Sequence, residues 1–186
     1  MEDKNVAQKY VAFLRGINVG GHHKVPMVDL KKELHNIGFK SVITLLNSGN
    51  VIFNYVNQNT STLEEYISKH LSTSFGFNIP IIVRKQEDIL ELAHDSPFSK
   101  IELTKNIKCY VSFLRNEETF AVELPWKSAD NSYQIIAHKN KAILSVLDLS
   151  ISKTTKAMEI LDKHFGKDIT TRNWNTIERI LKKINT

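Results

Sequence analysis

The sequence has few of the features that mark secreted, membrane-spanning or metal-binding proteins. Its single cysteine, Cys109, excludes an intramolecular disulfide and lies in an apolar stretch, where we expect a buried packing residue. The longest apolar runs are far shorter than the ~20 residues of a membrane-spanning helix, and the polar first residues lack the apolar core of a signal peptide. The seven histidines have no metal-ligand spacing. These absences predict a cytoplasmic protein with no membrane association and no bound metal.

A complete catalytic motif is also missing. No nucleophile-elbow pattern surrounds Ser48, and no nearby residue is indicated as its base. Histidine is the side chain best suited to proton transfer near neutral pH, and His22 and His23 are the local candidates. The catalytic residues, any cofactor, the oligomeric state and the question of whether the protein is an enzyme therefore stay open.

The chain carries a mild excess of positive charge. It has 25 lysines and arginines against 20 aspartates and glutamates, which gives a formal net charge of +5. This excess favours acidic partners such as nucleotides, phosphorylated metabolites or nucleic acid. No run of five like charges occurs, so a well-solvated surface explains the excess about as well.

The most informative segment is the glycine-rich stretch Arg15–Gly21. It follows a predicted strand, Tyr10–Leu14, and precedes a predicted helix, Pro26–Ile37. Successive backbone amides in a glycine-rich turn form a concave site for anions, and basic side chains beside it add charge-assisted hydrogen bonds. The alternative is a connection that its glycines merely permit. The candidate ligand-binding residues of this segment are Arg15, Gly16, Asn18, Gly20, Gly21 and Lys24.

Two further polar segments could contribute to a ligand site. In the turn Asn47–Asn50, Ser48 and Asn50 are candidate ligand-binding residues, although turn chemistry alone explains the sequence. The segment Thr170–Thr176 precedes a predicted last helix, Trp174–Ile184. It offers hydroxyls, an arginine and an indole, and capping plus packing is the alternative explanation. Its candidates are Thr171, Arg172, Asn173 and Trp174.

The first half of the chain reads as a split β-α-β, or ferredoxin-like, unit. A helix that opens with Ser61-x-x-Glu64, a capping-box pattern, ends near Gly76. The consecutive apolar residues of Tyr10–Leu14 are typical of a strand that is shielded on both faces. The predicted order is strand 10–14, helix 26–37, strands 42–46 and 51–55, helix 61–76 and strand 79–83.

The second half reads as a degraded copy of the first. Tyr10–Arg15 recurs as Tyr110–Arg115, with five of six positions matched at a spacing of 100 residues. A hairpin from 133–137 to 142–147 and helices 152–165 and 174–184 follow. We therefore predict an α+β fold of two duplicated ferredoxin-like subdomains with sheets covered on both faces. Residues 1–84 form the first, 85–106 a linker with a short helix, and 107–186 the second, which ends in a helix.

The three polar segments are also the ones in which the chain resembles a known family. Phe13–Gly21 with Met27 and Leu30, then Ser48–Val51, then Thr171–Thr176 resemble the bacterial family catalogued as domain of unknown function 1697. The resemblance extends from about Tyr10 to Ile184. It implies an α+β protein of two ferredoxin-like subdomains. It implies no established activity, so no catalytic residues follow from it.

These observations favour a binding protein for a phosphate-bearing small molecule or nucleotide. The glycine-rich segment would form one side of a cleft and the start of the last helix the other. The second copy reads Asn116–Glu118 where the glycine-rich loop would recur, so only the first copy suits an anion. The alternatives are a structural or interaction protein without a ligand and an enzyme that uses the same residues. RNA binding on exposed aromatics such as Tyr10, Phe13, Phe53 and Tyr55 ranks below a pocket ligand, because these strands are apolar on both faces.

Overall fold

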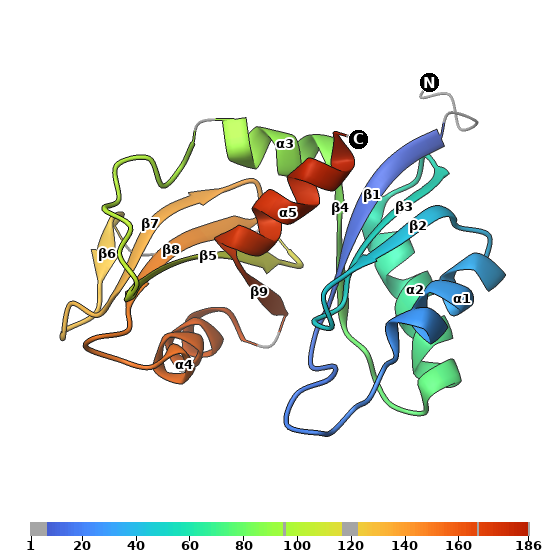
Figure 1. Ribbon diagram of the computed structural model, residues 1–186, viewed down its shortest axis with the longest axis horizontal. Coiled ribbons are helices and arrows are strands. Elements are labelled where there is room, and N and C mark those ends of the chain that lie inside the picture. The colour runs from blue at the N-terminus through green and yellow to red at the C-terminus, as the bar shows by residue number, and fades with distance from the viewer. Residues whose placement is uncertain (1–6, 95, 117–122, 167, 186) are drawn as a thin grey trace. The chain divides into compact units, whose positions relative to one another are not determined.

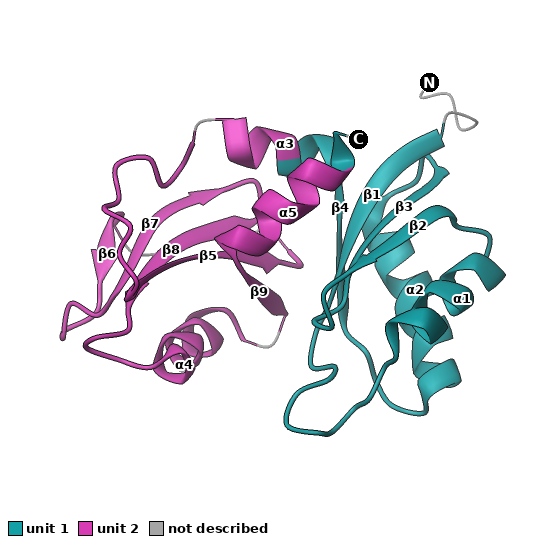
Figure 2. Cartoon of the chain, in the orientation of Figure 1, with its two compact units in different colours: residues 1–89, 184–186 teal, residues 90–183 magenta. Residues whose placement is uncertain are grey.

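The computed structural model describes residues 7–94, 96–116, 123–166 and 168–185. Within these ranges the chain has a mixed α+β architecture with two antiparallel sheets and five helices (Figure 1). The chain divides into two compact units (Figure 2). Unit 1 comprises residues 1–89 and 184–186, and unit 2 comprises residues 90–183. Glu117 and Glu118, which stand where the glycine-rich loop would recur, lie outside the described residues.

Unit 1 is built on a four-stranded antiparallel sheet with the strand order β2-β3-β1-β4. Two helices cover one face of this sheet (Figure 1), and a third, α3, follows the last strand across the boundary between the units. The elements are β1 (Ala7–Leu14), α1 (Met27–Asn36), β2 (Lys40–Leu45), β3 (Asn50–Val56), α2 (Thr60–Phe75), β4 (Ile81–Lys85) and α3 (Gln86–His94).

The core of unit 1 follows from the two-residue repeat of apolar residues in a strand and their spacing of about four residues in a helix. Alternate residues of β1, such as Tyr10 and Ala12, join the same apolar cluster as Leu30 and Leu34 of α1, which are four positions apart on one helix face. The residue between them in β1, Val11, is also fully buried. Both faces of β1 are thus shielded from solvent, as its unbroken apolar sequence predicts.

Unit 2 is built on a five-stranded antiparallel sheet with the strand order β6-β7-β8-β5-β9. Helix α4 packs its buried residues Ala157, Leu161 and Phe165 into the same cluster as Tyr110 and Leu114 of β5. The elements are β5 (Ile107–Leu114), β6 (Trp126–Lys127), β7 (Tyr133–Lys139), β8 (Ala142–Asp148), α4 (Thr154–Phe165), β9 (Ile169–Asn173) and α5 (Trp174–Ile184).

Strand β9 corrects one expectation, because Thr170–Asn173 is not simply a polar lead into the last helix. Residues Ile169–Asn173 pair antiparallel with Leu114–Tyr110 of β5 and form an edge of the sheet. The segment has one apolar residue in five, so it shows neither a continuous apolar run nor an alternation. Its β-branched residues are favourable in a strand, and its backbone pairing with the apolar β5 stabilises it further.

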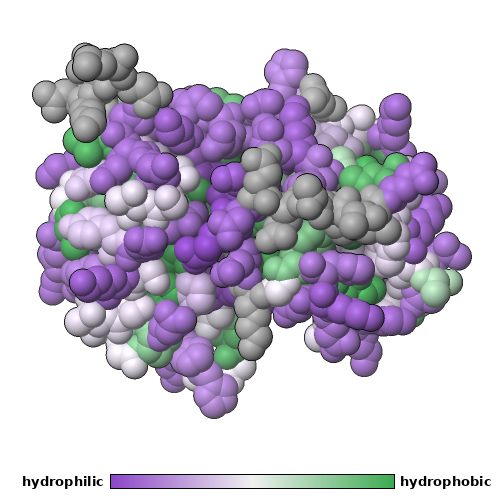
Figure 3. Space-filling view, turned by 180° about the vertical axis from the view of Figure 1, so that it is seen from behind, coloured by the Kyte–Doolittle hydropathy of each residue, from purple (hydrophilic) through white to green (hydrophobic). Residues whose placement is uncertain are grey.

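None of the helices in the described ranges is long and apolar enough to cross a bilayer. Hydrophilic side chains predominate on the face seen in Figure 3, and hydrophobic ones are scattered among them. Single exposed apolar residues of this kind are normal on globular proteins.

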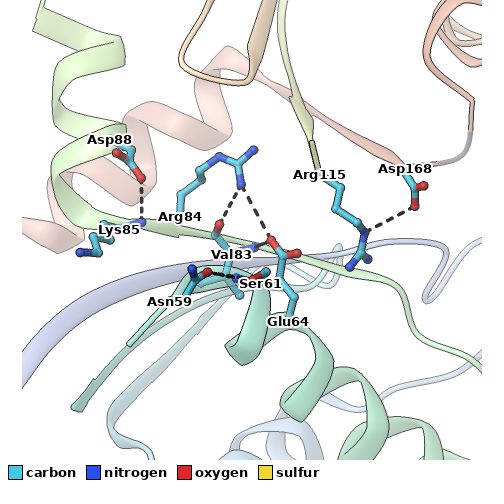
Figure 4. Close-up of polar contacts among 9 residues, drawn as sticks. All are labelled: Asn59, Ser61, Glu64, Val83, Arg84, Lys85, Asp88, Arg115 and Asp168. Atoms are coloured by element: carbon cyan, nitrogen blue, oxygen red, sulfur yellow. Dashed lines mark hydrogen bonds and ion pairs between the residues drawn. The ribbon is translucent and has the colours of Figure 1, made fainter. Parts of the chain in front are cut away.

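The start of α2 corrects a second expectation, since Glu64 does not close a capping box. The helix begins at Thr60, and the side chain of Asn59 caps it by accepting a hydrogen bond from the Ser61 amide at 2.9 Å (Figure 4). This start puts Glu64 beyond the third helical position, on the face that covers the sheet. Its Oε1 accepts the Val83 amide of β4 at 2.8 Å, and Nη1 of Arg84 lies 3.9 Å away.

A polar contact joins the two helices of unit 1. The Glu33 carboxylate of α1 accepts a hydrogen bond from Ser74 Oγ at 3.0 Å and contacts His70 Nε2 at 2.8 Å, both on α2. These contacts lower the pKa of Glu33 below its ordinary value, chiefly through the Ser74 hydrogen bond and then through His70, while burial acts in the opposite direction. The pair therefore links α1 to α2 most strongly when Glu33 is ionised.

We expect Glu33→Gln to reduce stability at neutral pH but not in acid. Because the pKa of Glu33 is lower in the folded than in the unfolded chain, its contribution is present above the unfolded pKa and is lost as the pH falls through the folded pKa. Urea unfolding should show a loss of about 0.5 kcal/mol at neutral pH, shrinking toward zero in acid. Glu65→Gln, at an exposed position of α2, is the matched control. A difference that persists unchanged at low pH would contradict this account.

Candidate functional site

The glycine-rich loop of unit 1 is held firmly at both of its ends. Ile17 is buried, and the Asn18 side chain donates to the carbonyl oxygens of Val25 at 2.9 Å and Asn47 at 2.8 Å. Its Oδ1 accepts the Val25 amide at 2.8 Å. Asn18 therefore ties the loop to the β2–β3 turn and uses its amide group for the backbone of the chain itself.

The tip of this loop, residues 19–24, is exposed. Gly20 and Gly21 have φ of +59° and +80°, and a Cβ at either position would meet no atom within 4 Å. Within the described residues, no hydrogen bond reaches the amides of these two glycines. Lys24 is exposed beside them, whereas the His23 ring stacks on Phe77 at 4.4 Å. The exposed tip thus offers amides and one lysine to an anion.

The β2–β3 turn has its own structural explanation. Asn50 is fully buried and donates to the Leu45 carbonyl oxygen at 2.9 Å and to Ser48 Oγ at 3.0 Å. Gly49, with φ of +73°, packs closely against the residues that begin the glycine-rich loop. Asn50 thus holds the turn together, and Ser48 is the member of the predicted pair that solvent reaches.

The candidates on β9 point in opposite directions. Successive residues of a strand alternate between its faces. Thr171 Oγ1 meets Ser112 Oγ at 2.8 Å on the face that α4 covers. Arg172 lies on the other face, where it is 8% exposed and its Nη1 donates to Thr170 Oγ1 at 2.8 Å. Burial lowers the pKa of Arg172 to about 10. A ligand on one face of this strand would therefore not meet both side chains.

A pocket of about 590 Å³ lies within unit 2 at the start of α5. We call it the α5 pocket. Its lining includes two predicted residues, Asn173 and Trp174, whereas Thr171 and Arg172 are not among the residues that line it. Asn173 Oδ1 accepts the Asn175 amide at 3.0 Å and so caps the helix, as the polar segment predicts. The half-buried Trp174 ring packs edge-to-face on Phe98, with ring centres 5.1 Å apart.

The α5 pocket also contains charged and nucleophilic groups that the sequence patterns did not indicate. Lys108 and Cys109 come from the start of β5, and Glu178 comes from α5. Burial raises the pKa of the Cys109 thiol to about 11, and the negative charge of Glu178 adds to the effect. Glu178 stands four residues after Trp174, on the same helix face. That spacing is the one signal in the sequence that could have linked it to the site.

The predicted site residues are therefore divided between the units. Arg15, Gly16, Asn18, Gly20, Gly21, Lys24, Ser48 and Asn50 belong to unit 1, whereas Thr171, Arg172, Asn173 and Trp174 belong to unit 2. Two of these residues, Asn173 and Trp174, line the α5 pocket. Across the described ranges, no cluster of three or more histidine, cysteine, aspartate or glutamate residues could hold a metal ion.

Comparisons with known proteins agree with this architecture. The chain is similar over 97% of its length to the whole of the conserved bacterial protein SP0830 from Streptococcus pneumoniae, with a TM-score of 0.71 and 22% sequence identity. That likeness concerns the fold alone. None of the curated proteins compared matches the chain. The model of the protein family of unknown function DUF1697 matches residues 7–143. The Thr171–Thr176 motif lies outside this match, whereas the motifs at Phe13–Gly21 and Ser48–Val51 lie within it. The chain therefore belongs to the DUF1697 family, as its sequence predicts.

Proposed function

We propose that this is a cytoplasmic ligand-binding protein whose α5 pocket holds a phosphate-bearing small molecule or nucleotide. One observation carries the proposal: a pocket of about 590 Å³ in which an aromatic wall, a lysine and the start of a helix lie together. This volume is in the range of about 300–1,000 Å³ that small-molecule sites occupy. The single cysteine of the chain supports a reducing compartment.

The lining of the pocket suits the two ends of a nucleotide. Trp174 lines the pocket and supplies an aromatic ring for a base to stack on, and Phe98 packs against that ring in a T-shaped contact. Lys108 supplies a positive charge for a phosphate. The start of α5, a helix of eleven residues, adds the positive end of the helix dipole. Aromatic and cationic groups in one concavity favour this ligand class over a purely apolar one.

The motifs of unit 1 support this proposal less directly. The side chains of Asn18 and Asn50 donate hydrogen bonds to nearby backbone carbonyl groups, which favours a structural role for both. The exposed loop tip with Gly20, Gly21 and Lys24 is a separate candidate contact for a phosphate. RNA binding on the sheet surface has little support, because Tyr10 and Phe53 are buried in the helix-covered core.

We further propose that the chain contains two duplicated ferredoxin-like subdomains, residues 1–84 and 107–186, which are joined by residues 85–106 and carry the sheets of unit 1 and unit 2. The strand order β2-β3-β1-β4 has a counterpart in β7-β8-β5-β9. The Leu14 amide donates to Gly49 O at 2.8 Å, and the Leu114 amide donates to Lys141 O at the same distance. The two donors are 100 residues apart and stand at the same position of the repeated strand. Their equivalent hydrogen bonds therefore support the duplication.

Thermal unfolding with a panel of phosphate compounds tests the ligand proposal. The panel contains inorganic phosphate, ribose 5-phosphate, AMP and GMP. A ligand at 100 times its Kd should stabilise the folded chain by about 2.7 kcal/mol, which raises Tm by several degrees. Trp174→Ala should abolish most of the ligand-induced shift because it removes the stacking surface.

Trp126→Ala is the matched control for that substitution. Trp126 is the other tryptophan of the chain, packs partly buried against the core of unit 2 and is not among the residues that line the α5 pocket. Its variant should melt at a lower temperature and keep the ligand-induced shift. The proposal fails if no compound in the panel raises Tm, or if both tryptophan variants respond as the wild type does.

A further inference from the structure

Two side chains of opposite charge line the α5 pocket. Lys108 comes from β5 and Glu178 from α5. In the part of the chain that the structure describes, neither side chain takes part in a hydrogen bond or ion pair. Glu178 nevertheless faces the pocket wall closely enough for its negative charge to raise the pKa of Cys109. A complementary ligand therefore presents an anion to Lys108 and hydrogen-bond donors to Glu178.

Helix geometry sets the distance between the stacking surface and the carboxylate. Trp174 and Glu178 are four residues apart on α5, so their Cβ atoms lie about 5–6 Å from each other on one face of the helix. Leu181 continues that face and also lines the pocket. A purine stacked on Trp174 thus has one edge beside Glu178.

The chemistry of that edge distinguishes the two purines. An ionised carboxylate is acceptor-only, and its two oxygens suit two parallel N–H donors. The Watson–Crick edge of guanine offers such a pair, N1–H and the exocyclic amine. The same edge of adenine offers one amine beside the N1 acceptor, whose lone pair would face a carboxylate oxygen. We propose that the α5 pocket selects guanine over adenine nucleotides and that Glu178 determines this preference.

This inference rests on the proposed function and adds an orientation to it. The phosphate lies toward Lys108 and the first turn of α5, because the carboxylate of Glu178 repels it from the other side. Lys108 then acts on every phosphate-bearing ligand alike, whereas Glu178 acts through the base. The two residues should therefore have separable effects on affinity and on selectivity.

Calorimetric titration of the full-length protein with GMP, IMP and AMP tests the assignment. Because solvent also reaches Glu178, we expect GMP to bind about tenfold more tightly than AMP, with IMP between them because it keeps N1–H and lacks the amine. Glu178→Gln should bring the GMP-to-AMP ratio close to one. Lys108→Gln should weaken both nucleotides by a similar factor and leave the ratio unchanged.

Two matched controls separate these effects from general charge removal. Glu159→Gln on α4 and Lys182→Gln on α5 change exposed charges of unit 2 that are not among the pocket residues. Both should keep wild-type affinity and selectivity. Equal binding of GMP and AMP to the wild type, or a ratio that Glu178→Gln leaves unchanged, overturns the guanine preference alone. Failure of all three nucleotides to bind overturns the proposed function as well.

Discussion

Replacement of Glu64 by leucine should destabilise unit 1 by about 3–5 kcal/mol, the usual cost of removing one partner of a buried ion pair. Glu64 is 2% exposed and Arg84 is 5% exposed. Burial lowers the pKa of Arg84, whereas the negative charges of Glu64 and Asp88 oppose that effect. Leucine would leave the guanidinium in a poorly solvated place with less compensation, and the Val83 amide would lose its acceptor (Figure 4).

A series of variants separates the charge from the hydrogen bond. Glu64→Gln keeps an oxygen for the Val83 amide and removes only the charge, so its cost in urea unfolding should be smaller than that of leucine. The double variant Glu64→Leu, Arg84→Met removes both charges and should recover part of the loss, because apolar replacement of a buried pair is often close to neutral. A Glu64→Leu cost below about 1 kcal/mol would show that the pair lies in a more solvated setting than its burial indicates.

Gly49→Ala should cost about 2–4 kcal/mol, from overpacking together with the left-handed backbone. Gly49 has φ of +73°, and a Cβ there would lie 2.7 Å from Leu14 Cβ and 2.8 Å from Ile17 Cδ1. Leu14 Cβ cannot rotate away, because its position is set by β1. The turn would have to move, and with it the Asn50 contacts that hold it.

Gly20→Ala is the control for the cost of the left-handed backbone conformation. Gly20 also has positive φ, at +59°, but a Cβ there would meet nothing within 4 Å. Its alanine variant should cost only about 1–2 kcal/mol for the left-handed conformation. The difference between the two variants in the free energy of unfolding, measured in urea, gives the cost of the steric overlap at Gly49. Equal costs would mean that the turn relaxes without loss.

The elements that the sequence predicted best are those with a complete pattern of their own. Helix α5 begins at Trp174 and ends at Ile184 as expected, because Ile177, Leu181 and Ile184 recur at helical spacing. Strand β9 was not predicted because its stability comes from pairing with β5, a partner far away in the sequence. The role of Glu64 was misjudged for a related reason: its acceptor atom serves a strand that follows it by many residues.

The candidate site shows the same division. The sequence pointed to Asn173 and Trp174, which line the α5 pocket, because a cap and an aromatic residue stand together at the start of a helix. Lys108 was not, because it belongs to a strand whose apolar sequence indicates only a core. Asn18 and Asn50 bond to the backbone around them, and their role as ligand contacts stays a prediction. A pocket depends on which segments meet, and spacing along the chain does not determine that.

The buried position of Cys109 has a consequence for the redox behaviour of the protein. A thiol with a pKa of about 11 is almost entirely protonated at neutral pH, and the thiolate is the form that reacts with oxidants and disulfides. Because this is the only cysteine of the chain, no second thiol within the molecule can trap it as a disulfide. The Cys109 thiol should therefore react more slowly with oxidants and disulfides than an exposed, acidic cysteine does.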